Sequence, residues 1–239
     1  MEVWAELEPS SRWERLGARA AALLDAGVDA IDIPEAPLGT PRGYAPILAC
    51  LLRQRLGART VPHVRVLDLN LNAAVSVAKG LRACGVEEVV VLRGDPPAYG
   101  RPTGTRSEEA ASLIRRLVPG VRVGALLSLR HGLPRVLERL GGPFDFFLVT
   151  RWPGRLSDLS EVSVEARARG KRLIGYLIVG CGESLARLKS MLNGQPVHAP
   201  REAVELAASV AGLLDGVLVS SPGDIDCMLR VIEMLKGGL

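Results

Sequence analysis

The chain has 239 residues, of which 48% are hydrophobic and 23% are charged, and this length suits one domain with a large buried core. No apolar run reaches the roughly 18 residues of a membrane span, and the acidic N-terminal residues are unlike a signal peptide, so we expect a cytoplasmic protein without membrane contact. The net charge of +4 comes from singly scattered arginines among only 4% aromatic residues, which argues against nucleic-acid binding.

Short apolar runs alternate with helical patterns along the whole chain. The predicted strands are Val3–Glu8, Ala30–Ile33, Val61–Leu67, Glu88–Arg93, Arg122–Ser128, Phe144–Thr150, Arg172–Gly180 and Gly216–Ser220. The predicted helices are Ser11–Ala26, Tyr44–Leu56, Leu71–Cys84, Ser107–Leu117, Leu133–Leu140, Leu156–Arg169, Glu183–Leu192 with Arg201–Leu214, and Ile225–Leu235. Eight such units without a linker predict an α/β fold, a single (β/α)8 TIM barrel over residues 1–239, with Asn193–Pro200 as a loop. An open doubly wound sheet is the alternative, but no G-x-G-x-x-G follows the first strand.

The four cysteines, Cys50, Cys84, Cys181 and Cys227, are far apart in the sequence and form no C-x-x-C pair. This spacing indicates neither a disulfide framework nor a metal site. We therefore expect four thiols in the core and no bound metal.

The stretch Glu88–Pro97 combines four consecutive apolar residues with a charged end, Arg93-Gly94-Asp95. The apolar part predicts a strand that is buried on both faces. Charged residues at the end of such a strand are costly unless a site uses them, and Gly94 allows close approach of the backbone to a ligand. An ion pair that only closes a loop is the alternative interpretation.

Alternation along the strands predicts which side chains face the barrel interior, because successive residues of a strand point to opposite faces. The charged residues assigned to the interior are Glu6, Glu8, Asp32, His63, Arg65, Arg93 and Asp95. The apolar residues assigned to the opposite wall are Phe144, Phe146, Leu148, Leu173, Leu177 and Val179. A pocket that is half charged and half apolar suits a flat heteroaromatic ligand. Structural ion pairs within the barrel, such as Glu8 with Arg65, are the alternative.

Three motifs resemble those of the methylenetetrahydrofolate reductase family of flavin-dependent barrels. Residues 5–9 read AELEP and are similar to the family's Phe-Glu-Phe-Phe-Pro opening. Residues 63–68 read HVRVLD and resemble its strand-three histidine with a downstream aspartate, and residues 92–97 read LRGDPP, the most specific match. Asn70 extends an Asp-x-Asn variant found in relatives fused to a homocysteine methyltransferase, which residues 29–34 also resemble.

The resemblance implies a role for individual residues. Glu6 matches the general acid that helps to open the methylene bridge of the folate, and Asp95 matches the catalytic aspartate beside the flavin and pterin rings. His63, Arg93 and Gly94 match flavin-contacting positions, and His131 lies near a cofactor-contacting histidine, although a surface histidine at a helix start is equally consistent. With Glu6 and Asp95, the residues expected to bind substrate are Asp32, Asp68, Asn70 and Thr150, the last in place of a family glutamine.

The chemistry agrees with these residue types. Protonating a tertiary amine at neutral pH needs a carboxylic acid with a raised pKa, and neighbouring carboxylates would raise the pKa of Glu6. Nearby arginines would favour an anionic reduced flavin. The resemblance therefore implies reduction of 5,10-methylenetetrahydrofolate, or of an analogous methylene-tetrahydropterin, to the 5-methyl form with FAD, using NADH or NADPH.

The second half of the chain departs from the family. The family's dinucleotide-binding helix after strand five is replaced by residues 133–142, which read LPRVLERLGG. FMN, or the absence of a tightly bound flavin, therefore remains open beside FAD, as do a homo-oligomer and a partner subunit.

Other functions also fit parts of the sequence. Gly180–Ser184 and Ser220–Gly223 are small-residue loops before helices, where barrels often bind phosphate, so a phosphate-binding lyase or isomerase is one alternative. A pterin-dependent methyltransferase and a non-catalytic barrel subunit of a one-carbon complex are the others.

Overall fold

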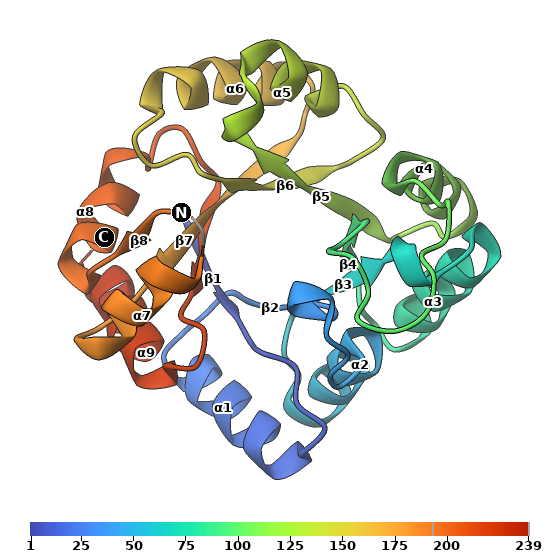
Figure 1. The fold of residues 1–239 in the computed structure, drawn as a ribbon, viewed down its shortest axis with the longest axis horizontal. Coiled ribbons are helices and arrows are strands. Elements are labelled where there is room, and N and C mark those ends of the chain that lie inside the picture. Colours follow the sequence, from blue (N-terminus) through green and yellow to red (C-terminus); the bar gives the residue numbers. More distant parts are fainter. Residues whose placement is uncertain (193, 239) are drawn as a thin grey trace.

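The computed structural model describes residues 1–192 and 194–238, in which strands and helices alternate from the first residues onward (Figure 1). The strands of the ring are β1 Glu2–Glu6, β2 Ala30–Ile33, β3 Thr60–Arg65, β4 Glu88–Leu92, β5 Arg122–Ser128, β6 Phe146–Thr150, β7 Arg172–Val179 and β9 Gly216–Ser220. Each pairs in parallel with the next, and β9 pairs with both β7 and β1, so the sheet closes on itself. The chain is a (β/α)8 TIM barrel, as the sequence predicts.

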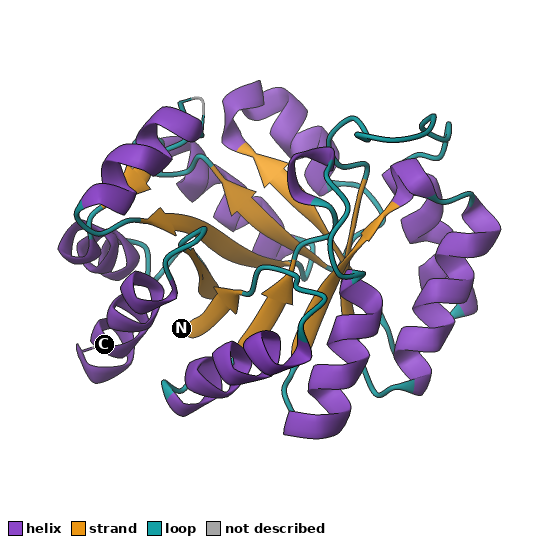
Figure 2. Cartoon of the chain, turned by 60° about the horizontal axis from the view of Figure 1, so that its bottom comes forward, coloured by secondary structure: helices purple, strands orange, loops and turns teal. Residues whose placement is uncertain are grey.

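Helices form an outer layer around this ring (Figure 2). They are α1 Trp13–Asp25, α2 Ala45–Leu56, α3 Leu71–Ala83, α4 Ser107–Leu117, α5 Leu133–Leu140, α6 Leu156–Ala168, α7 Glu183–Met191, α8 Pro200–Ser209 and α9 Ile225–Gly238. Short 3-10 turns at Pro37–Gly39, Val66–Asp68 and Leu129–His131 follow β2, β3 and β5. Within the described ranges, none of these helices is long and apolar enough to cross a membrane.

A ninth strand lies outside the ring. Residues 193–200 are predicted as a loop, but Val197–His198 forms β8, which pairs in parallel with Ile178 and Val179 at the end of β7. Val197 is buried with Ile178 and Leu188. A strand of two residues is too short to produce a readable alternation, so β8 could not be predicted from the sequence. Asn193 itself lies outside the described residues.

Apolar side chains fill the ring interior and, separately, the layer between strands and helices. The interior cluster consists of Trp4, Ala30, Val61, Val90, Leu92, Phe146, Leu148, Ile174 and Leu218. The predicted interior wall is therefore right for Phe146 and Leu148 but wrong for Phe144, Leu173, Leu177 and Val179, which pack toward the helices. Strand β7 is apolar on both faces, so alternation could not distinguish its two sides.

Charged residues close the amino-terminal end of the ring. Glu88 is 2% exposed and binds Arg59 (2.7 Å), Arg122 (3.2 Å) and Arg172 (3.0 Å). Glu2 binds the same Arg59 (3.2 Å) and Arg172 (2.7 Å) and accepts the indole hydrogen of Trp4. These five charged residues, the basal network, leave the carboxyl end of the strands as the open end of the interior.

The prediction of four free thiols is wrong. Cys50 of α2 is bonded to Cys84 at the end of α3, and Cys181 after β7 is bonded to Cys227 in α9. The partners are 34 and 46 residues apart, with Cα atoms 5.4 and 5.7 Å apart. Closure of the ring makes these segments neighbours, and residue spacing carries no record of that proximity.

Candidate active site at the carboxyl ends of the strands

Glu6 is the last residue of β1 and points into the open end of the ring, where it is partly exposed. Its Oε2 atom accepts a hydrogen bond from the Tyr176 hydroxyl of β7 (2.6 Å). Its Oε1 atom accepts one from the Ser220 hydroxyl at the end of β9 (2.7 Å). Residues 170 and 214 positions away thus fix both oxygens of a single carboxyl group.

Asp32 and His63 lie beside Glu6 on the next two strands. Asp32 is fully buried, stands opposite Glu6 in the β1–β2 register, and its Oδ1 atom lies 3.0 Å from His63 Nε2. The second oxygen, Oδ2, is buried without a hydrogen-bond partner. The interior positions predicted for Glu6, Asp32 and His63 are therefore correct.

The surroundings shift the protonation of this group. Burial raises the pKa of Glu6, and the negative charge of Asp32 raises it further, although the hydrogen bonds from Tyr176 and Ser220 oppose this. Burial acts to lower the pKa of His63, but the Asp32 carboxylate, together with the charges of Glu6 and Glu35, raises it overall. Burial and Glu6 also raise the pKa of Tyr176 well above its ordinary value. Glu6 is thus suited to act as a proton donor.

Arg65 and Gly94 form a contact at the rim above β3 and β4. Arg65 is 3% exposed and donates to the Asp68 carboxylate (2.7 Å) and to the backbone oxygen of Asp95. Gly94 has a φ of +83°, and a Cβ there would lie 2.5 Å from Arg65 Nε. The space over Gly94 is therefore filled by Arg65, although Gly94 was predicted to allow close approach of a ligand there.

Arg93, Asp95 and Glu8 do not face the interior, so this part of the prediction is wrong. Strand β4 ends at Leu92, and Arg93 and Asp95 beyond it are exposed. The Asp95 carboxylate accepts the backbone hydrogen of Leu38 (3.1 Å) from the loop after β2. Strand β1 ends at Glu6, and Glu8 lies 3.8 Å from Arg19 of α1 rather than near Arg65. Alternation holds only while a strand continues.

The side chains of Asp68 and Asn70 make contacts within the protein at the start of α3. Asn70 caps this helix by accepting the backbone hydrogen of Ala73 (2.9 Å), and Asp68 pairs with Arg65. An Asn at this position is a common helix cap. Glu6, Asp32, His63, Tyr176 and Ser220 are together called the Glu6 cluster. Among the described residues, neither Asp68 nor Asn70 shows a hydrogen bond or ion pair to it.

His131 and Thr150 line a groove of about 590 Å³ beside the open end, together with Asp95 and Ser128. The same groove contains four arginines, Arg130, Arg135, Arg139 and Arg151. Arg139 is engaged by Glu108 and by the backbone oxygen of Leu126, and Arg130 lies 3.2 Å from the exposed His131 ring. A cationic groove of this size fits the phosphates of a flavin nucleotide.

The two small-residue loops carry a carboxylate where a phosphate would bind. The Ser184 hydroxyl donates to Asp224 (2.6 Å), and the other Asp224 oxygen accepts the Cys227 backbone hydrogen at the start of α9 (3.0 Å). A cap that is already negatively charged disfavours an anion at that helix end. This geometry gives the phosphate-binding lyase or isomerase no support.

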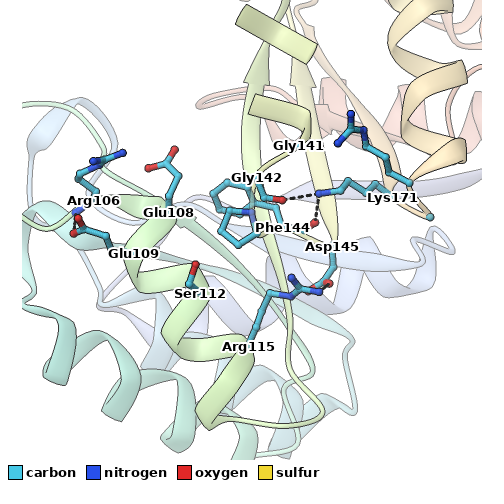
Figure 3. A pocket seen from close by; sticks show the side chains of 13 residues that line it. Arg106, Glu108, Glu109, Ser112, Arg115, Gly141, Gly142, Phe144, Asp145 and Lys171 are labelled. Atoms are coloured by element: carbon cyan, nitrogen blue, oxygen red, sulfur yellow. Dashed lines mark hydrogen bonds and ion pairs between the residues drawn. The ribbon is translucent and has the colours of Figure 1, made fainter. Parts of the chain in front are cut away.

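Another groove, of about 670 Å³, lies on the outer wall between α4 and the turns that follow α5 and α6 (Figure 3). Two of its cations already have partners within the protein. Lys171 donates to the backbone oxygens of Gly142 (2.6 Å) and Phe144 (3.0 Å), and Arg115 pairs with Asp145 (3.0 Å). It contains no member of the Glu6 cluster.

The sequence pattern did not point to Tyr176, and it indicated Ser220 only as the start of a possible phosphate-binding loop, not as a partner of Glu6. A weak signal existed for Tyr176, since it is the one polar side chain inside the apolar run 173–179, and for Ser220, since it ends the last strand. The sequence pattern also did not point to Glu35 and Tyr44 in the loop after β2. Glu35 accepts the Ala45 backbone hydrogen (2.7 Å), and burial, Glu35 and Asp68 raise the pKa of Tyr44 to about 12.

Fold and site define a TIM-barrel protein with a partly exposed acid, Glu6, at the carboxyl ends of its strands. Its sequence matches no family model and no curated protein. In structure it is similar to an uncharacterized protein from Clostridium thermocellum that binds two copies of 5-methyl-5,6,7,8-tetrahydrofolic acid (11% identity, TM-score 0.69, covering 100% of this chain and 96% of that one).

Two further structures share the fold. One is the tryptophan synthase complex of the hyperthermophile Pyrococcus furiosus (12% identity, TM-score 0.64, covering 99% of this chain and 98% of that one). The other is Yersinia pestis DHPS with a pterine–sulfa conjugate (13% identity, TM-score 0.54, covering 99% and 94%). At these identities the similarity establishes the barrel fold alone.

Proposed function

We propose that this barrel is an enzyme that binds a reduced folate or a related pterin at its open end and reduces the methylene group of a methylene-tetrahydropterin to the methyl form. The observation that carries this proposal is Glu6, a partly exposed carboxyl group held by Tyr176 and Ser220 with a raised pKa. A carboxylic acid that keeps its proton near neutral pH is what a tertiary amine of the substrate requires.

The mixture of apolar and polar side chains at the site supports a pterin ligand. Leu126 and Tyr176 are partly exposed and pack on the interior apolar cluster, which gives a flat ring an apolar surface opposite Glu6 and His63. Two structures that share the fold, from Clostridium thermocellum and Yersinia pestis, contain a tetrahydrofolate and a pterine conjugate. Pterins need apolar contact on their faces and polar groups at their edge.

A flavin fits the residues beside the site. When bound, it would supply the hydride that reduces the substrate, with NADH or NADPH as the electron source. The residues placed to hold it are Arg130, Arg135, His131 and Thr150 in the adjoining groove. Glu6 would then give its proton to the amine nitrogen of the substrate, and Asp95 at the rim remains the predicted second catalytic residue.

The test is a comparison of Glu6→Gln with Glu8→Gln, which makes the same chemical change two residues away at the partly exposed ion pair with Arg19. Visible spectra before and after addition of FAD or FMN measure flavin binding, and mass spectrometry of the methyl product measures reduction. We expect wild type and Glu8→Gln to form the product. Glu6→Gln should lose at least about 100-fold in folate reduction while flavin reduction by the nicotinamide continues.

Two results would contradict the proposal. One is undiminished product formation by Glu6→Gln. The other is a wild-type protein that binds neither a flavin nor 5-methyltetrahydrofolate at millimolar concentration. Loss of both half-reactions in Glu6→Gln, with unchanged thermal unfolding, would assign Glu6 to cofactor binding instead.

A further inference from the structure

The Oδ2 atom of Asp32 is a buried acceptor without a donor. Asp32 is fully buried, and only its other oxygen is engaged, by His63. An ionised oxygen without a hydrogen bond in such a place is strongly unfavourable. A donor is therefore expected next to Asp32, and the hydrogen bonds of the neighbouring groups indicate which one.

Glu6 is the neighbouring group with a hydrogen left to give. It stands opposite Asp32 in the β1–β2 register, so both side chains project from adjacent strands into the same interior. The hydroxyl hydrogens of Tyr176 and Ser220 are both directed to Glu6. When Glu6 is protonated, its own acid hydrogen needs an acceptor, and Asp32 Oδ2 is unoccupied.

We propose that Glu6 and Asp32 share one proton, with His63 as the balancing cation, and that this carboxyl pair rather than Glu6 alone is the acid of the site. The role as an acid toward a tetrahydropterin rests on the proposed function, whereas the shared proton does not. Two carboxylates that project from adjacent strands into one interior repel each other, and this repulsion favours keeping one proton on the pair.

The pair and the groups that face it come from five strands. They are Glu6 on β1, Asp32 on β2, His63 on β3, Tyr176 on β7 and the uncharged Ser220 on β9, with Glu35 from the loop after β2 acting on His63 at longer range. A singly protonated pair carries one negative charge, and the His63 imidazolium cancels it. Burial is tolerated because the cluster is neutral in this state.

The cluster also provides a route for returning the proton. When the proton passes from Glu6 to an amine nitrogen of the substrate, the pair is left with two negative charges beside the imidazolium. His63 is hydrogen-bonded to Asp32 and can return a proton through it to Glu6. His63 is 6% exposed and would then regain a proton from water at the open end. No oxidant or further co-reactant is needed for this transfer.

Infrared spectroscopy of the ligand-free full-length protein tests the shared proton. The carbonyl stretch of a protonated carboxylic acid, identified by its shift in D₂O, is followed as a function of pH. We expect wild type and the control Glu8→Gln to show this band at neutral pH. Glu6→Gln and Asp32→Asn should each abolish it, because either substitution removes one member of the pair.

His63→Gln provides a second measurement if Asp32→Asn fails to fold. Loss of the His63 imidazolium favours retention of the proton on the Glu6–Asp32 pair. The carbonyl band of the protonated acid should therefore titrate at least about one pH unit higher than in wild type. A band that survives in Asp32→Asn, or a midpoint unchanged in His63→Gln, would overturn the shared proton.

The two proposals fail separately. A band that disappears as expected, in a protein that reduces no folate, would support the carboxyl pair and reject the proposed function. Folate reduction that depends on Glu6, together with a band insensitive to residue 32, would reject the pair and support the function.

Discussion

At the scale of single residues, the open end of the barrel is held by contacts between distant strands. Glu6 is fixed by Tyr176 and Ser220, and Asp32 by His63. The rim depends in the same way on Arg65, whose guanidinium group reaches both Asp68 and the backbone of Asp95 while its stem passes over Gly94. A glycine is required there because a side chain would occupy the space that Arg65 fills.

Gly94→Ala should be strongly destabilising. A Cβ at residue 94 combines a positive φ with an approach of 2.5 Å to Arg65 Nε, so we expect a loss of about 2–4 kcal/mol of unfolding free energy. Gly100→Ala is the matched control, because its φ of +79° is similar but nothing lies within 4 Å of a Cβ there. It should lose only about 1–2 kcal/mol. Urea unfolding measures both, and equal losses would show that Arg65 does not restrict residue 94.

At the scale of elements, five strands, β1, β2, β3, β7 and β9, deliver side chains to the site, and the loops and helix starts that follow β3 and β4 form the rim. The disulfides join such units: Cys50–Cys84 links α2 to the end of α3, and Cys181–Cys227 links the loop after β7 to α9. The second lies in the same segment as the Ser184–Asp224 hydrogen bond. Together these two contacts hold the loops after β7 and β9 against each other.

Replacing either cysteine pair by serines should cost stability. A cross-link that closes a loop of 34 or 46 residues restricts the unfolded chain by roughly 4 kcal/mol in the chain-entropy model. We expect the urea midpoint of wild type to fall on addition of dithiothreitol and to match the quadruple-serine variant in the same buffer. Thiol titration of the denatured, unreduced protein should find no free thiol. Four titratable thiols there would contradict the disulfides.

At the scale of the whole molecule, the two ends of the ring have different electrostatic roles. The basal network pairs Glu2 and Glu88 with three arginines and closes one end. The Glu6 cluster occupies the other end and leaves one carboxyl oxygen unpaired. The structure thus separates charges that stabilise the barrel from charges that are available for chemistry.

The basal network predicts a pH-dependent contribution to stability. Burial acts to raise the pKa of Glu2, but the hydrogen bond from Trp4 and the charges of Arg172 and Arg59 outweigh it and lower that pKa. A lowered folded-state pKa stabilises the fold above the unfolded value, 4.5, and the contribution is lost as the pH falls through the folded value.

Glu2→Gln tests this contribution through thermal unfolding at several pH values. We expect wild type to exceed the variant by about 1 kcal/mol near neutral pH, a modest value because Glu2 is one-third exposed. The difference should disappear below about pH 3, where both side chains are uncharged. A difference that is independent of pH would mean that Glu2 acts through packing rather than charge.

Alternation within strands predicted much of the site and failed where the strands stop. Asp32 and His63 lie inside β2 and β3, and their predicted orientation is correct. Strand β4 ends at Leu92, directly before Arg93, and strand β1 ends at Glu6, two residues before Glu8. The backbone therefore leaves the strand direction before either charged residue. Tyr176 was missed because both faces of β7 are apolar, and only pairing with its neighbours decides which face is inside.

The sequence by itself determined the repeating units, because apolar periodicity and the turn residues between elements are local properties of the chain. It also placed a carboxylate at the end of the first strand and the Asp32–His63 pair on the next two. Only the tertiary structure decided that Tyr176 and Ser220 hold Glu6, that the cysteines are paired, and that Arg65 rather than a ligand covers Gly94. These contacts join residues 29 to 214 positions apart. The packing of neighbouring units brings the nearer ones together, and closure of the ring brings Tyr176 and Ser220 to Glu6.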